Sequence, residues 1–158
     1  FINIKSNELQ LGRGGKKLVN TTKILSTYGN EFMLRTESDK KITDISKNLT
    51  IPIINLLSPS SHPCQVLSDV FTVEEIKKKP ISKLNICWIG DANNNVINSL
   101  IEASAKFSFK LNIGCPKNYE PKKQLLIWAK NNNSKIKVFN NTKNEAKNAS
   151  RGGPEGTK

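Results

Sequence analysis

The only histidine of the chain, His62, stands beside residues that could bind a small polar ligand. It is followed by Pro63 and, one turn later, by Gln65, in the stretch SSHPCQVLSD. Proline suits the first helical position and disfavours helical conformation in the residue before it, so we predict that His62 is an N-cap. A helix N-terminus presents unpaired N–H groups and a partial positive charge, which favour an anionic or strongly polar ligand. A histidine that only caps the helix fits the local pattern equally well.

The cysteines predict neither a metal site nor a catalytic thiol. Cys64, Cys87 and Cys115 are far apart in the sequence and form no Cys-x-x-Cys pair. A zinc site of the usual kind needs such pairs or further histidines. Cys64 and His62 are two residues apart and therefore lie on different sides of a helix, which disfavours a thiolate–imidazole pair.

Two glycine-containing stretches are weaker candidates for a site. LGRGGKK lacks the spacing of a phosphate-binding loop and has no Ser or Thr after its lysine, so we interpret it as a turn. WIGDANNN stands where a predicted strand meets a predicted helix, the position at which α/β proteins build sites. A Gly-Asp turn that caps a helix explains the second stretch equally well.

Strand-like and helix-like segments alternate along the chain. Short apolar runs predict buried strands, and apolar residues at helical spacing predict the intervening helices. The alternation predicts an α/β fold of parallel sheets with flanking helices, in which ligands lie beyond the carboxyl ends of the strands. The expected strands are FINI, EFMLRT, IPIINLL, KLNICWIG, FKLNIGC and KIKVFN. The expected helices lie in KKLVNTTKILSTYG, SDKKITDISKNL, the segment from Pro63 through Val66, Leu67, Val70 and Phe71 towards Pro80, NVINSLIEASAKFS and PKKQLLIWAKNN.

Composition limits the classes of partner. The net charge of +12 invites a nucleic-acid hypothesis, but the basic residues are mostly scattered lysines and few arginines are present for base readout. A genome rich in A and T would give the same excess of Lys, Asn and Ile. No apolar run is long enough for a membrane span. We therefore expect a soluble protein that binds neither nucleic acid nor membranes.

Longer segments carry more specific motifs. IPIINLLSPSSHPCQVLSDVFTVEE contains a His-Pro-x-Gln element followed by Asp69 and Thr72, and WIGDANNNVINSLIEASAKF and CPKNYEP come after it. In motif, order and separation these segments resemble the ornithine branch of the aspartate/ornithine transcarbamylase family. The resemblance runs from about Phe1 to about Ala149 and implies the middle of such an enzyme.

The resemblance implies parts of two transcarbamylase α/β domains. Residues 1–78 would be the C-terminal half of a carbamoyl-phosphate-binding domain, and residues 79–148 the N-terminal part of an ornithine-binding domain. The charged run KKKPISK lies at this boundary. Residues 149–158 are rich in Gly and charge, and we expect them to be an unstructured tail.

The resemblance also implies roles for individual residues. Arg35, His62 and Gln65 would bind carbamoyl phosphate and act in catalysis, Arg35 and His62 at the carbonyl oxygen and Gln65 at the carbamoyl NH₂. Asn95 would contact ornithine, with Asn94 as the alternative because three asparagines follow one another. Catalysis would be positional and electrostatic, without a metal or an organic cofactor.

The implied reaction transfers the carbamoyl group to the side-chain amine of ornithine and gives citrulline and phosphate. Family members are homotrimers, and we expect a cytoplasmic location, or the mitochondrial matrix in a eukaryote. The family's Ser-x-Arg-Thr, Asp-x-x-x-Ser-Met and His-Cys-Leu-Pro segments do not occur in this sequence, so we expect the chain alone to be inactive. A carbamoyltransferase for a modified ornithine and a non-catalytic basic binding module are the alternatives.

Overall fold

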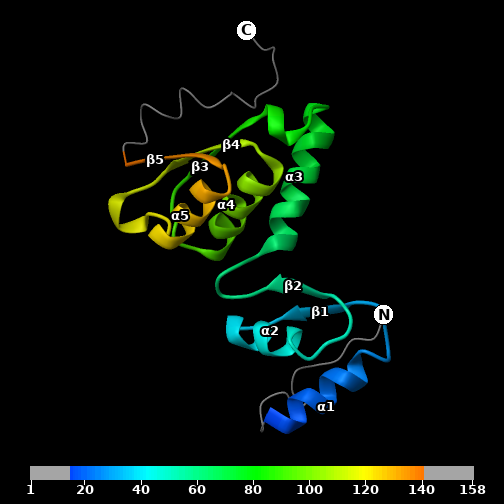
Figure 1. The fold of residues 1–158 in the computed structure, drawn as a ribbon. Coiled ribbons are helices and arrows are strands. Elements are labelled where there is room, and N and C mark those ends of the chain that lie inside the picture. Colours follow the sequence, from blue (N-terminus) through cyan, green and yellow to red (C-terminus); the bar gives the residue numbers. More distant parts are fainter. Residues whose placement is uncertain (1–14, 141–158) are drawn as a thin grey trace. The chain divides into compact units, whose positions relative to one another are not determined.

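The computed structural model describes residues 15–140, with side chains described from residue 20 onward. The chain divides into two compact units, with the division between Pro59 and Ser60. Both units contain parallel strands and helices (Figure 1). The expected strand FINI, most of the LGRGGKK stretch and the expected tail at 149–158 lie outside the described residues.

The first unit contains a strand–helix–strand arrangement. β1 (Phe32–Arg35) and β2 (Ile53–Leu57) pair in parallel, and α2 (Asp39–Ser46) connects them. The helix begins where the sequence predicts, because the Ser38 side chain accepts a hydrogen bond from the backbone N–H of Lys41.

The core of the first unit is small. α1 (Gly15–Leu25) contributes Thr22 and Leu25, and α2 contributes the fully buried Ile45. Every residue of β2 is only half-buried, although its apolar sequence predicts a buried strand. The reason is that β1 is the only strand paired with β2 in the described part of the chain.

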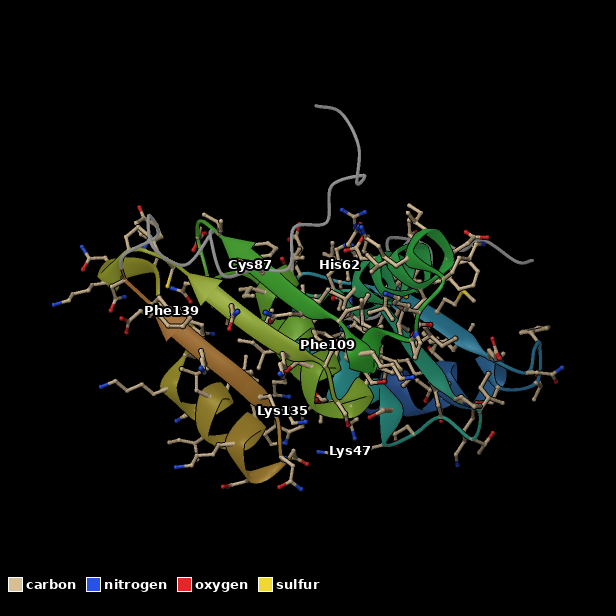
Figure 2. All side chains as sticks on the ribbon, turned by 90° about the horizontal axis from the view of Figure 1, so that it is seen from above. Lys47, His62, Cys87, Phe109, Lys135 and Phe139 are labelled. Carbon is tan, nitrogen blue, oxygen red and sulfur yellow. The ribbon has the colours of Figure 1, made fainter. Side chains whose placement is uncertain are left out.

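The second unit contains a three-stranded parallel sheet in the order β3-β4-β5. β3 (Asn85–Ile89), β4 (Lys110–Gly114) and β5 (Lys135–Phe139) pair without a register shift. Figure 2 shows Lys135 at the start of β5 and Phe139 at its end. The carboxyl ends of all three strands therefore lie at one edge of this sheet.

Two helices cover one face of this sheet (Figure 1). α4 (Asn95–Phe107) connects β3 to β4, and α5 (Lys123–Asn131) connects β4 to β5. Right-handed crossovers place both helices on the same side of a sheet with this strand order. The core between them is apolar, and its fully buried members include Ile97, Ile101, Phe109, Leu111 and Ile113. Two short 3₁₀ helices also lie in this unit, η1 (Ile81–Lys83) and η2 (Lys117–Tyr119).

α3 (Pro63–Lys77) packs against α4 through only one of its faces. Val66 and Val70 are buried, whereas Leu67 and Phe71, which are also expected along this helix, are 51% and 66% exposed. The expected α/β class, with parallel sheets and flanking helices, is confirmed. Within residues 15–140, no helix has the length and apolar character to cross a membrane.

Candidate functional site

His62 stands at the N-terminus of α3, as predicted, but its side chain does not cap the helix. The residue has non-helical backbone angles and Pro63 follows in the first helical turn. The ring atom Nδ1 is buried and has no hydrogen-bond partner in the part of the chain that the structure describes. A buried polar atom without a partner calls for an explanation, and the described residues supply none. Figure 2 labels His62.

Two side chains of α4 hold the loop that carries His62. The Oγ of Ser99 accepts the backbone N–H of His62 at 2.8 Å and lies 2.9 Å from the Oγ of Ser61. The Nδ2 of Asn98 donates to the backbone carbonyl of Ser60 at 2.9 Å. These bonds join residues that are distant in sequence, so helix packing sets the position of the histidine.

Gln65 lies one turn into α3, on the exposed side of the helix. Its Nε2 donates to Oδ1 of Asp69 at 3.0 Å, across one further turn. This bond orients the carboxamide of Gln65, because residues four apart are neighbours on a helix surface. His62 and Gln65 thus stand three positions apart at the same helix end, as the His-Pro-x-Gln pattern predicts.

The WIGDANNN stretch forms the turn between β3 and α4. Oδ1 of Asn94 accepts the backbone N–H groups of Val96 and Ile97 at 3.0 and 3.1 Å. Its Nδ2 donates to the backbone carbonyl of Asp91 at 3.0 Å. Asn94 is therefore the N-cap of α4, and the half-buried Asn95 is the first helical residue.

Arg35 lies at the carboxyl end of β1, and its side chain is exposed. The pairing register shifts between Leu34 and Arg35, which brings Arg35 opposite Leu57 at the end of β2. Arg35 belongs to the first compact unit and His62 to the second. The structure therefore describes these two predicted site residues separately.

Cys115, which directly follows β4, is not suited to act as a thiolate nucleophile. Burial raises the pKa of the Cys115 thiol, and the carboxylates of Glu120 and Asp91 raise it further. The thiol is thus neutral near pH 7, and a neutral thiol is a poor nucleophile. Among residues 15–140, no group of three or more His, Cys, Asp and Glu side chains could hold a metal ion.

Sequence reasoning missed Asn98 and Ser99. Both are polar, both are at least nine-tenths buried at 7% and 3% exposure, and both stand in an apolar helix. Polar residues between the apolar positions of NVINSLIEASAKF are the one signal that could have identified them. Their partners in the 60–62 loop could not be read from local spacing.

Comparisons with known proteins identify a family for both halves of the chain. Residues 1–75 match the model "Aspartate/ornithine carbamoyltransferase, carbamoyl-P binding domain", and residues 82–151 match "Aspartate/ornithine carbamoyltransferase, Asp/Orn binding domain". Ornithine carbamoyltransferase from Brucella ovis is 41% identical over 135 residues, which are 85% of this chain and 42% of that protein. The protein of the same name from Mesorhizobium japonicum is 39% identical, over 85% of this chain and 44% of its own length.

Solved structures show the same relationship. Ornithine carbamoyltransferase from Pyrococcus furiosus has a TM-score of 0.75 and 32% identity, covering 87% of this chain and 44% of that chain. The anabolic ornithine carbamoyltransferase from Campylobacter jejuni has a TM-score of 0.73 and 30% identity, covering 85% and 45%. The chain therefore spans less than half the length of the relatives it matches. With nearly its whole length matched by the two domain models, the chain belongs to the aspartate/ornithine carbamoyltransferase family.

Proposed function

We propose that this chain carries part of the active site of an ornithine carbamoyltransferase, which transfers the carbamoyl group of carbamoyl phosphate to the side-chain amine of ornithine. The products are citrulline and phosphate. The observation that carries the proposal is the His62 imidazole at the N-terminus of α3, where Nδ1 is buried without a partner among the described residues. The curated relatives from Brucella and Mesorhizobium support it, since both are named ornithine carbamoyltransferase.

In the proposed reaction, the amine of ornithine attacks the carbonyl carbon and negative charge develops on the carbonyl oxygen. The bond from the carbonyl carbon to the phosphate oxygen then breaks, phosphate leaves, and the amine gives up a proton to the departing phosphate or to solvent. His62 and Arg35 stabilise the carbonyl oxygen, while the carboxamide of Gln65 holds the carbamoyl NH₂ group. The bond from Gln65 to Asp69 supports this role, because it orients the carboxamide in advance. One lost donor at such a site costs on the order of a hundredfold or more in rate.

Asn95 is the proposed contact for the amino-acid part of ornithine. The competing Asn94 uses its side-chain oxygen to cap α4 and its amide nitrogen to bind Asp91. A side chain with both ends engaged has little left to offer a substrate. Asn95 stands at the start of the same helix, near the carboxyl end of β3, which is where ligands of α/β proteins bind.

Residues 1–78 are proposed as part of a carbamoyl-phosphate-binding domain and residues 79–148 as part of an ornithine-binding domain. The ranges of the two family matches, 1–75 and 82–151, support this division. α3 falls in the first range by sequence but in the second compact unit by packing, since it contacts α4.

For the whole protein we propose a homotrimer, located in the cytoplasm or, in a eukaryote, in the mitochondrial matrix. Carbamoyl phosphate and L-ornithine are its proposed partners, with neither nucleic acid nor membrane among them. The family membership supports the two substrates, because the matched domains are named for binding carbamoyl-P and Asp/Orn.

A chimeric enzyme tests the proposal. The matching 135 residues of the Brucella ovis ornithine carbamoyltransferase are replaced by those of this chain, and citrulline is measured with carbamoyl phosphate and ornithine. We expect activity, and we expect His62→Asn to lower kcat by about a hundredfold or more. A chimera that elutes at the size of the Brucella enzyme but forms no citrulline would contradict the proposal. Activity that is unchanged in the His62→Asn chimera would contradict it as well.

A further inference from the structure

We propose that Ser99 and Asn98 are positioning residues for His62, so that α4 sets the place of the imidazole in carbamoyl transfer. The inference rests on the proposed function, in which His62 binds carbamoyl phosphate. It concerns two residues that touch the loop rather than the substrate. Both belong to the same compact unit as His62.

Ser99 is the stronger of the two tethers. Its hydroxyl accepts the N–H of His62 at 2.8 Å and also pairs with the hydroxyl of Ser61 at 2.9 Å. The N–H at an N-cap has no partner within its own helix, so it must find one elsewhere. With Ser99 only 3% exposed, water cannot readily replace this hydroxyl. Its loss would leave a donor of the histidine backbone unsatisfied.

Asn98 anchors the other end of the same loop. Its amide nitrogen donates to the carbonyl of Ser60 at 2.9 Å, and the residue is 7% exposed. The imidazole Nδ1 has no partner of its own among the described residues. The ring is therefore held through the loop backbone, and α4 fixes that backbone on both sides of Ser61.

The same helix face links the two proposed substrate contacts. Asn95, Asn98 and Ser99 stand at positions i, i+3 and i+4 of α4, which are neighbours on a helix surface. Asn95 is the proposed contact for ornithine, and the other two hold the residue proposed for carbamoyl phosphate.

The single histidine gives a direct test by NMR on the untagged 158-residue chain, because all imidazole signals come from His62. The variants are Ser99→Ala and, as a matched control, Ser104→Ala. Ser104 is a fully buried serine of the same helix whose hydroxyl bonds only to the carbonyl of Ile101 in the described chain. The readouts are the imidazole signals, hydrogen exchange of the His62 amide and the Kd for carbamoyl phosphate.

We expect Ser99→Ala to shift or broaden the imidazole signals and to speed exchange of the His62 amide by roughly tenfold. It should weaken carbamoyl phosphate binding by roughly three- to tenfold, the range of one hydrogen bond. Ser104→Ala should change none of these, even where it lowers stability. Unchanged imidazole signals in Ser99→Ala, or equal effects in both variants, would overturn the proposal.

Two other outcomes of this experiment also have a clear meaning. If Ser99→Ala does not fold, hydrogen exchange in the wild-type chain still tests the positioning role. A His62 amide that exchanges as fast as an exposed loop amide would contradict its hydrogen bond to Ser99. If the wild-type chain does not bind carbamoyl phosphate, the chimera decides the proposed function, because the chain carries only part of the site. The imidazole signals and amide exchange of Ser99→Ala then still support or overturn the positioning role by themselves.

Discussion

Replacing Asn94 by Ala should destabilise the second unit by about 2 kcal/mol. Loss of the N-cap bonds from Oδ1 to the amides of Val96 and Ile97 costs about 1 kcal/mol. Loss of the bond from Nδ2 to the carbonyl of Asp91 adds roughly 0.5–1.5 kcal/mol. The sum lowers the ratio of folded to unfolded molecules by a factor of about 30.

Urea unfolding followed by tryptophan fluorescence measures this change in one unit of the chain. Both tryptophans, Trp88 and Trp128, belong to the second unit, so the first unit contributes no tryptophan signal. Asn94→Ser should recover about half of the loss, since serine is an equally good N-cap but cannot replace the bond from Nδ2 to the carbonyl of Asp91. Asn93→Ala is the matched control at an exposed neighbour and should stay within about 0.5 kcal/mol of wild type.

The outcome also bears on the choice between the two asparagines. If Asn94→Ala leaves the free energy of unfolding unchanged, or if Asn93→Ala costs as much, Asn94 is not the structural cap. Asn94 would then remain a candidate for the ornithine contact.

Three further predictions concern the core, pH and activity. Phe109→Ala should cost about 3–5 kcal/mol in urea unfolding because Phe109 is 0% exposed. Phe107→Ala should cost less than half as much, since Phe107 is 39% exposed, and equal losses would contradict the core assignment. Burial raises the pKa of Glu102 above its usual value of 4.5, and the charge of Lys106 opposes this rise. The ionised carboxylate therefore destabilises the fold at pH 7. Glu102→Gln should raise the free energy of unfolding at pH 7, and this gain should vanish as the pH falls below 4.5. A gain that is constant with pH would refute this cause. Finally, the chain alone should form no measurable citrulline from carbamoyl phosphate and ornithine, and any formation that depends on the chain would contradict its expected inactivity.

Local patterns predicted the order of elements and the ends of helices. Ser38 caps α2 and Pro63 opens α3 because capping and proline geometry depend on only a few neighbouring residues. The exposure of Leu67 and Phe71 could not be predicted in this way. Which apolar residues of a helix are buried depends on which neighbour packs against it, and α4 covers only the face with Val66 and Val70.

The candidate site shows the same limit. The pattern His-Pro-x-Gln placed His62 and Gln65 at one helix end, where the structure has them. The three asparagines left Asn94 and Asn95 undecided, since only the observed bonds of Asn94 show which of them caps α4. The tether from Ser99 to His62 depends on the packing of two helices and has no local signature.

A titration with carbamoyl phosphate, observed at the imidazole signals of His62, tests the central claim most directly. The chain contains one histidine, so the signals need no assignment among several. We predict a saturable shift with a Kd of about 1 mM, some 4 kcal/mol of binding free energy. Gln65→Ala should weaken the binding. An imidazole that does not respond to carbamoyl phosphate, or responds equally in Gln65→Ala, would contradict a carbamoyl-phosphate site at the start of α3.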